Sequence, residues 1–221
     1  MLRKAISFLY PINIYKQPSA NSKMLEVTWV DGKLLLDSEN ANYSFGSLQR
    51  VLRQGLSAIG FARIEKMQEI LVLGVAGGSV IHTLIDEANF RGNITGVEID
   101  PQVIDVARKF FSLDEIQNFE VVIDDAAEFV KTTTKRFNLI IIDIFNDQEM
   151  PGFLFEQPFI DNVTLLLEPG GFILFNTMPM DRSQQERNIK FVSNIDTKSF
   201  RVNALPRMET YNELIVIEKN R

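Results

Sequence analysis

One stretch, residues 69–100, constrains the fold of this chain more than any other. It reads EILVLGVAGGSVIHTLIDEANFRGNITGVEID. The apolar run at residues 70–73 predicts a buried strand, a loop with three glycines follows it, and residues 79–87 have the pattern of a helix. A second apolar run, residues 95–97, leads to an acidic residue. This order of strand, glycine loop, helix and strand predicts the first βαβ unit of a nucleotide-binding sheet.

The predicted unit is suited to bind a nucleoside. Where a parallel strand ends and a helix begins, unpaired N–H groups point into a crevice, and glycines let a ligand approach the main chain. Glu98 follows Gly74 by 24 residues, near the interval of about 20 at which an acid accepts hydrogen bonds from ribose hydroxyls. Because Ala76 replaces the second glycine of G-x-G-x-x-G, a ligand without phosphate fits better. The alternative is a glycine turn in an unrelated α/β protein, with Glu98 a solvated strand end.

Two later apolar runs also end in acidic residues. The first is followed by Asp124 and Asp125, and the second, residues 137–142, is followed by Asp143. The carboxyl ends of parallel strands line one ligand crevice, so we expect these acids to converge with Glu98. The alternative for Asp125 and Asp143 is that each only caps the helix after it.

The two ends of the chain predict antiparallel strands. Alternating apolar residues flank the dipeptide Asp31-Gly32, which is typical of a tight hairpin turn. Apolar spacing over residues 48–64 predicts one helix. Near the end of the chain, residues 199–205 and 213–218 form two apolar runs with no helix between them, which indicates an antiparallel pair at a sheet edge.

The composition is that of an ordinary folded protein, and it excludes several kinds of catalytic and binding site. Of 221 residues, 45% are apolar and 24% charged, as in globular domains. The absence of cysteine and the single histidine exclude disulfides, thiolate chemistry and a multi-histidine site, and we expect no metal. A net charge of −6 gives no general attraction for nucleic acid. With no apolar run of 18 residues and no signal-peptide pattern, we expect no membrane span and a cytoplasmic protein.

Taken together, the chain resembles the spermidine synthase-like family, a branch of the class I S-adenosylmethionine-dependent methyltransferase fold. The segments that carry the resemblance are the hairpin with V-D-G, Tyr43 after it, LVLGVAGGSV, GVEIDPQVIDVARKFF, the D-D-A at residues 124–126, LIIIDIFND and LLLEPGGFILFN. The fold expected is α/β, with a doubly wound, seven-stranded methyltransferase-type sheet, an antiparallel C-terminal strand pair and a small N-terminal β-hairpin. We expect an N-terminal segment at residues 1–45, of which the first 22 indicate no particular structure, and an S-adenosylmethionine-binding domain at residues 46–221.

The resemblance implies a cofactor side and a substrate side for the site. The residues implied on the cofactor side are Gly74, Ala76, Gly77, Glu98, Asp124, Asp125 and Ala126. Of these, the loop residues would cradle the methionine-derived part, although packing is an alternative role for Ala76. Glu98 would hold the ribose, and Asp125 would accept a hydrogen bond from the adenine amino group. Asp143 stands at the position of the catalytic aspartate beside the attacking amine.

The chain departs from the aminopropyltransferase pattern on the substrate side. Gly77 stands where those enzymes have an aspartate, and Ser44 replaces the histidine after Tyr43. Asn146 replaces the second aspartate of their D-x-x-D segment, with Asp147 one residue later. A loop carboxylate about 4 Å from the ammonium of decarboxylated S-adenosylmethionine contributes about 4 kcal/mol at an effective dielectric near 20. A neutral loop therefore suits intact S-adenosylmethionine better.

Three hypotheses follow. The first is an S-adenosylmethionine-dependent, methyltransferase-like enzyme acting on a small molecule, with Asp143 as base or substrate anchor. The second is a true aminopropyltransferase that makes spermidine from decarboxylated S-adenosylmethionine, with Asp147 replacing the missing acid. The third is a non-catalytic nucleoside-binding homologue. The resemblance also implies that the hairpin at residues 24–36 pairs two copies as a homodimer, since an exposed strand edge can be extended.

Overall fold

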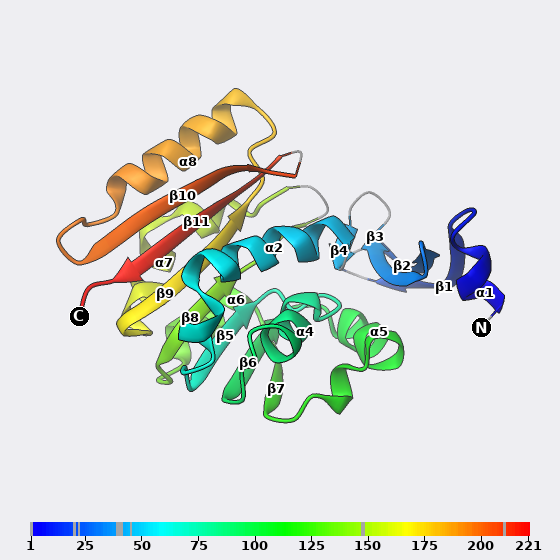
Figure 1. Ribbon diagram of the computed structural model, residues 1–221. Helices are drawn as coiled ribbons and strands as arrows, with labels where there is room; N and C mark the ends of the chain where they lie inside the picture. Colours follow the sequence, from blue (N-terminus) through cyan, green and yellow to red (C-terminus); the bar gives the residue numbers. More distant parts are fainter. Residues whose placement is uncertain are drawn as a thin grey trace.

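The computed structural model describes residues 2–19, 21, 23–38, 42–44, 46–146, 149–209 and 211–221, and only the backbone of residues 42, 43 and 206–208. These residues form two sheets. A seven-stranded sheet with helices on both faces makes up most of the molecule, and a four-stranded antiparallel sheet lies at one end (Figure 1).

The large sheet has the order β10-β11-β9-β8-β5-β6-β7. Its parallel strands are β5 (Glu69–Leu73), β6 (Asn93–Glu98), β7 (Phe119–Ile123), β8 (Phe137–Ile142) and β9 (Leu167–Thr177). Antiparallel to β9 runs β11 (Asn212–Lys219), which pairs in turn with β10 (Phe200–Met208). The predicted α/β sheet with its antiparallel C-terminal pair is therefore confirmed.

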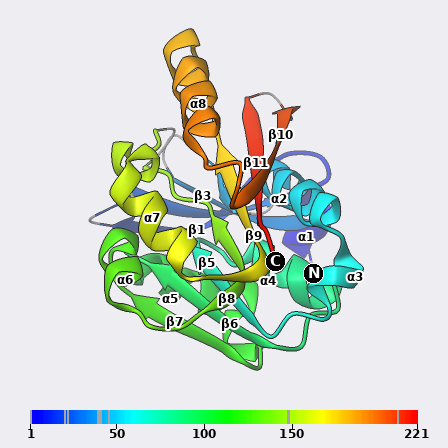
Figure 2. The ribbon, with the colours of Figure 1, turned by 90° about the vertical axis from the view of Figure 1, so that its left-hand side faces the viewer.

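Alternate residues of the central strands face two separate cores. In β8, Leu139 and Ile141 pack in one core, and Ile140 and Ile142 pack in the other. The first core is covered by α2 (Gly46–Ile59), α3 (Phe61–Ile64), α4 (Ser79–Asp86) and α5 (Pro101–Phe111). The second is covered by α6 (Ala126–Thr132), α7 (Gln157–Leu165) and α8 (Arg182–Asn194) (Figure 2). Short 3-10 helices, η1 (Leu113–Glu115) and η2 (Gly152–Phe155), complete the domain. Burial on both faces explains why these strands are continuously apolar.

The helix predicted over residues 48–64 is two helices. Gly60 interrupts it with a φ of 104°, which an L-residue rarely adopts and an α-helix cannot contain. The amide of Gly60 closes α2 on the carbonyl of Leu56, and the carbonyl of Gly60 then accepts from Arg63 and Ile64. The apolar spacing continues through the break because α3 packs on the same core, so periodicity alone could not reveal it.

The N-terminal hairpin is confirmed, and it belongs to a larger sheet than the pattern indicated. Strands β2 (Lys23–Val30) and β3 (Lys33–Ser38) join through Asp31 and Gly32, both at positive φ. On either side lie β1 (Ile12–Ser19) and β4 (Asn42–Ser44), and the short α1 (Leu2–Ile6) precedes them. The division of the chain at residues 45 and 46 stays a prediction.

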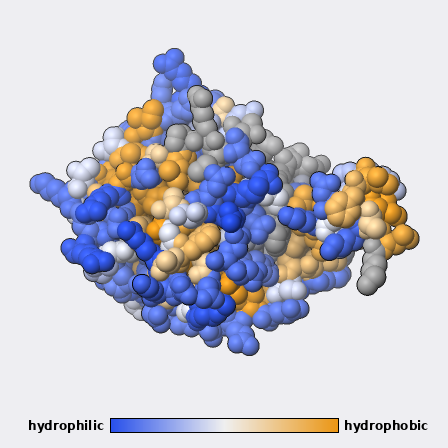
Figure 3. Space-filling view, viewed as in Figure 1, coloured by the Kyte–Doolittle hydropathy of each residue, from blue (hydrophilic) through white to orange (hydrophobic). Residues whose placement is uncertain are grey.

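The small sheet packs on α5. Buried side chains from the two parts form a third apolar cluster, which consists of Leu25, Val27, Leu36, Val103, Val106 and Phe111. The far end, at α1 and the turn after it, carries the exposed side chains of Leu2, Phe8, Leu9 and Tyr10, and an apolar area is visible at this end in Figure 3. Within the described part of the chain, no helix has the length and apolar character needed to cross a membrane.

Candidate active site

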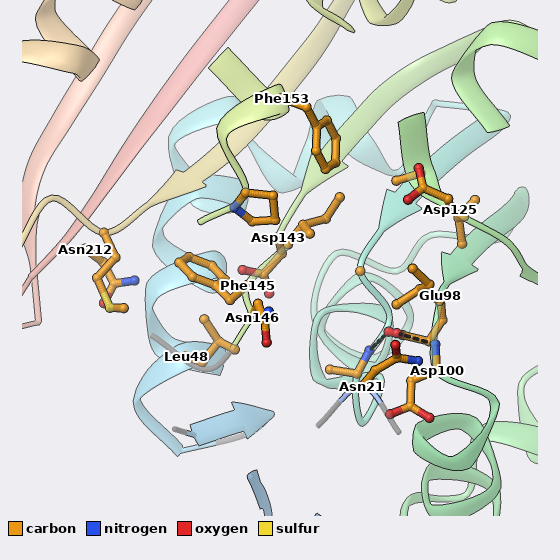
Figure 4. Close-up of a pocket in the computed structure, with 18 of the residues that line it drawn as sticks. Asn21, Leu48, Glu98, Asp100, Asp125, Asp143, Phe145, Asn146, Phe153 and Asn212 are labelled. Atoms are coloured by element: carbon orange, nitrogen blue, oxygen red, sulfur yellow. Dashed lines mark hydrogen bonds between the residues drawn. The ribbon is translucent and has the colours of Figure 1, made fainter. Parts of the chain in front are cut away.

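A cleft of about 460 Å³ lies at the carboxyl ends of the parallel strands (Figure 4). The acids that line it are Glu98, Asp100, Asp124, Asp125 and Asp143. The structure thus brings together the strand-end acids that the sequence pattern expected to converge, since parallel strands deliver their carboxyl ends to one edge of a sheet. The cleft also contains residues from the small sheet, from α2 and from β11.

The glycine loop fits tightly against the end of β8. Gly74 has a φ of 89°, and a Cβ built on it would lie 2.1 Å from the carbonyl oxygen of Asp143. Ala76 adopts the left-handed region with a φ of 47°, and both it and Gly74 line the cleft. Gly77 is buried within the loop and is not among the lining residues. The structure therefore presents Gly74 and Ala76, rather than Gly77, to a ligand.

Glu98 ties the loop to the end of β6. Its Oε2 accepts hydrogen bonds from the backbone N–H groups of Val75 and Ala76, each at 3.1 Å, and its Oε1 accepts from the N–H of Asp100 at 3.1 Å. Burial raises the pKa of Glu98, an effect that these three hydrogen bonds oppose. A carboxylate oxygen can accept more than one hydrogen bond, so Glu98 keeps the capacity to accept from ribose hydroxyls in the cleft.

Asp100 connects this side of the cleft to the small sheet. Asp100 is buried and is the N-cap of α5, because its Oδ1 accepts from the N–H of Gln102 at 3.0 Å. Its Oδ2 accepts from the hydroxyl of Ser19. The Ser19 hydroxyl accepts from the N–H of Asn21, which lines the cleft. Asp before Pro101 is an N-cap signal that the sequence contains. Nothing in the sequence indicated Asn21, because only the docking of the small sheet brings it there.

Asp143 lies in the middle of the cleft and is hydrogen-bonded to one asparagine side chain, which is in turn hydrogen-bonded to a second. Its Oδ1 accepts from Nδ2 of Asn176 at 2.8 Å, and the Oδ1 of Asn176 accepts from Nδ2 of Asn212 at 3.1 Å. Burial raises the pKa of Asp143 to about 6; the bond from Asn176 opposes this rise, and the charge of Glu98 adds to it. A carboxylate with this pKa is ionised at neutral pH and accepts a proton readily. Sequence reasoning missed Asn176 and Asn212 as site residues, although Asn176 ends an apolar run as the acids do.

Asp125 is the N-cap of α6. Its Oδ1 accepts from the N–H groups of Ala127 at 2.7 Å and Glu128 at 3.3 Å. Asp124 accepts from the N–H of Asp125 at 2.8 Å, and Ala126 begins the helix at the cleft wall. The capping alternative is therefore present in the structure. It leaves the Oδ2 of Asp125 outside these two bonds, and contact with adenine stays a prediction.

The substrate-side positions are only partly described. Asn146 lines the cleft, and its backbone pairs with that of Glu149. The side chain of Tyr43 and the whole of Asp147 lie outside the described residues. Ser44 is buried, and its hydroxyl accepts from the N–H of Ser79 at 3.2 Å at the start of α4. Ser44 therefore holds β4 against the helix after the glycine loop.

The remaining wall of the cleft is mostly apolar. Its side chains come from the start of α2, from the segments after β8 and β9, and from the start of β11, and they include Leu48, Phe145, Phe153, Met178, Met180 and Tyr211. From the sequence, Phe145, Phe153 and Phe155 are candidates for an acceptor wall, with core packing as the favoured alternative. Phe145 and Phe153 line the cleft, whereas Phe155 packs against Phe175 and Phe191. His82, the single histidine, lies elsewhere: its Nε2 is 2.8 Å from the carbonyl oxygen of Phe111, which joins α4 to the end of α5.

Comparison with known proteins agrees with this geometry. The family model described as "Spermine/spermidine synthase domain" matches residues 51–208. The chain belongs to this family. A polyamine aminopropyltransferase of Thermoplasma volcanium is 32% identical over 111 residues, 48% of this chain and 40% of that protein. One of Neisseria meningitidis is 32% identical over 119 residues, 53% of this chain and 45% of that protein. The matches therefore span less than half the length of these relatives.

Two solved structures have the same fold as this chain. The spermidine synthase of Thermotoga maritima has a TM-score of 0.74 at 18% identity, over 95% of this chain and 73% of that one. Human methyltransferase-like protein 13, in complex with SAH, has a TM-score of 0.66 at 20% identity, over 80% of this chain and 83% of that one. Both likenesses show the shared methyltransferase-type fold.

Proposed function

We propose that this protein transfers the aminopropyl group of decarboxylated S-adenosylmethionine to an amine. The observation that carries the proposal is the position of Asp143, with a pKa of about 6, in the same cleft as Glu98 and the glycine loop. Membership of the spermine/spermidine synthase family and the relatives named as aminopropyltransferases support this hypothesis over methyl transfer.

The residues of the cleft suit the parts of such a donor. Glu98 accepts from the ribose hydroxyls, and Gly74 and Ala76 present main chain to the part near the sulfur. The donor supplies a sulfonium, and neutral methylthioadenosine leaves when the bond from its sulfur to the aminopropyl carbon breaks. These cofactor roles follow from the resemblance and from the fit of the lining residues to a nucleoside.

Asp143 acts on the acceptor. An ammonium group cannot attack, because its lone pair is occupied by a proton, so it must lose that proton first. The ionised carboxylate of Asp143 takes the proton and orients the resulting amine toward the carbon bound to sulfur. Asn176 holds Oδ1 of Asp143, which leaves the other oxygen for the acceptor. Asp143 then releases the proton to solvent.

Methyl transfer from intact S-adenosylmethionine is the second candidate. The loop from Gly74 to Gly78 reads GVAGG and offers no carboxylate to the ammonium of the decarboxylated donor. A loop of this kind suits a donor that carries its own carboxylate.

Calorimetry and product analysis separate the candidates. Decarboxylated S-adenosylmethionine is expected to bind at least about tenfold more tightly than the intact form, a difference of about 1.4 kcal/mol, and to release methylthioadenosine in the presence of an amine. A tenfold preference for intact S-adenosylmethionine, with S-adenosylhomocysteine as product, would support methyl transfer instead. Binding of neither donor nor of methylthioadenosine would favour a non-catalytic protein.

A further inference from the structure

The charged groups of the cleft are concentrated at one end. Glu98 and Asp100 follow β6, Asp124 and Asp125 follow β7, and Asp143 follows β8. Strands β9 and β11 lie on the other side of β8 in the sheet. No carboxylate of the described residues lines the end of the cleft that these two strands form. In Figure 4, Glu98 and Asp125 lie on one side and Asn212 on the other, with Asp143 between them.

The end without carboxylates is apolar and aromatic. Leu48, Phe145, Met178, Met180 and Tyr211 line it. The polar groups of the described residues there are neutral amides and hydroxyls, and one of the amides, Asn212, donates to Asn176. The described part of this wall offers packing area to an apolar group and offers no carboxylate to a cation.

Three acids of the described residues lie next to this end in sequence, and all three already accept hydrogen bonds. Glu209 precedes the start of β11, and its carboxylate bonds Arg50 with both oxygens, at 2.7 and 3.2 Å. Glu213 accepts from the side-chain amide of Asn188 at 3.0 Å. Asp181 follows Met180 and caps α8 by accepting from the N–H of Gln184 at 2.8 Å. None of the three acids is among the residues that line the cleft.

The distribution of charge in the cleft affects which kind of acceptor can bind. Every acceptor needs one amine, which binds to Asp143 in the middle of the cleft. A diamine carries a second ammonium, and burying it against methionine and aromatic side chains without a partner is unfavourable. An alkyl or aryl group in the same place removes apolar surface from water and is favoured.

We propose that the acceptor is a primary monoamine with an apolar alkyl or aryl body, which rests on the aminopropyl transfer proposed above. The ammonium gives its proton to Asp143, and the nitrogen lone pair attacks the carbon next to the sulfonium. The N–C bond forms as the C–S bond breaks, and the electron pair of that bond stays on sulfur. The products are a secondary ammonium, which takes over the positive charge of the sulfonium, and neutral methylthioadenosine.

The first experiment compares acceptors with the full chain and decarboxylated S-adenosylmethionine at pH 8, with release of methylthioadenosine as the readout. The acceptors are hexylamine, 2-phenylethylamine and 1,4-diaminobutane. We expect a kcat/KM for one of the monoamines at least about tenfold above that for the diamine, since an unpaired charge penalises the diamine. An equal or higher kcat/KM for the diamine would overturn the inference and leave the proposed function standing. Turnover of no amine would overturn both.

A charge placed at the apolar end gives an independent test. Met180 lines this end and is 43% exposed, so Met180→Glu adds a carboxylate at little risk to the fold. We expect it to raise the ratio of kcat/KM for the diamine to that for the monoamine by about fivefold or more. The matched variant Met180→Gln adds similar volume without charge, and it should leave this ratio unchanged. An unchanged ratio in Met180→Glu would contradict the inference.

A third experiment tests whether Asp147 binds the second ammonium of a diamine. If the wild-type protein prefers the diamine and Asp147→Asn removes that preference, the second ammonium belongs to Asp147 and the monoamine inference is wrong. If Asp147→Asn leaves a monoamine preference unchanged, the inference stands.

Discussion

Asp143 is the residue at which stability and activity oppose each other. Its carboxylate is held by Asn176 in the cleft, and burial raises its pKa to about 6. Because the folded-state pKa is raised, protonation favours the fold. The ionised form costs the folded state up to about 3 kcal/mol at a pH above 6, and this cost disappears below the ordinary aspartate pKa near 4.

Asp143→Asn is therefore expected to raise the free energy of unfolding at pH 8 and to leave it nearly unchanged near pH 3.5. The substitution keeps an oxygen that accepts from Asn176 and removes the charge. Aminopropyl transfer should fall by about 100-fold or more, and in the wild-type protein it should rise with pH through about 6. Urea unfolding at the two pH values and a pH–rate profile measure both effects. A variant less stable than wild type at pH 8 would contradict this account.

Glu98 is predicted to dominate nucleoside binding. Glu98→Ala removes a carboxylate that accepts from the N–H groups of Val75 and Ala76 and that is expected to accept from ribose. Calorimetry with methylthioadenosine should show binding weaker by roughly 1.5 to 3 kcal/mol. Glu120→Ala is the control, because Glu120 is exposed and pairs with Lys135 away from the cleft. Equal affinities of the wild type and Glu98→Ala would remove Glu98 from the site.

At the scale of the element, the conformation of the glycine loop requires a residue without a side chain where the loop passes closest to the end of β8. A Cβ at Gly74 would lie 2.1 Å from the backbone oxygen of Asp143, and the φ of 89° disfavours any L-residue. Gly74→Ala should lower the free energy of unfolding by about 3 kcal/mol or more, or prevent folding. Gly152→Ala is the control, since no atom lies within 4 Å of a Cβ there, and its effect should stay within about 0.5 kcal/mol. Similar stabilities of the two variants would contradict the structure of the loop.

At the start of α6, two variants of Asp125 distinguish a role in capping the helix from a role in binding the ligand. Asp125→Ala removes the N-cap and should cost about 1 kcal/mol of stability. Asp125→Ser retains a cap and removes the second carboxylate oxygen, which is the one expected to meet adenine. Thermal unfolding should therefore distinguish the two variants, while calorimetry should show weaker nucleoside binding, by about fivefold, in both. If Asp125→Ser restores both stability and binding, Asp125 is only a cap.

At the scale of the whole molecule, the homodimer stays a prediction. The hairpin at residues 24–36 lies between β1 and β4, so these two strands, rather than the hairpin, form the edges of the described sheet. The exposed fractions of Leu9 and Phe8 are 84% and 63%, next to the edge strand β1. If two copies associate through this end, Leu9→Glu should give a monomer by sedimentation equilibrium, because it places a charge in an apolar contact. Leu165→Glu is the control, since Leu165 is 62% exposed on α7 in another part of the molecule. A dimer that persists in Leu9→Glu would place the interface elsewhere.

Local sequence patterns were enough to predict most of the strands and helices in chain order, and the family resemblance supplied the seven-stranded sheet. Strands buried on both faces are continuously apolar, and Gly74, Pro101 and Asp125 mark where the chain turns or a helix begins. The break at Gly60 was missed because α3 continues the apolar spacing of α2 on the same core. The strands β1 and β4 were missed because short, half-exposed strands carry a weak pattern.

The sequence by itself determined where the acids gather. Their positions at the ends of successive parallel strands require it, since such strands share one carboxyl edge. Only the tertiary structure decided what lies opposite them. Asn212 is brought to the cleft by the antiparallel course of β11, and Asn21, from the segment between β1 and β2, by the docking of the small sheet. Contacts of this kind depend on how elements pack, which no local pattern of residues encodes.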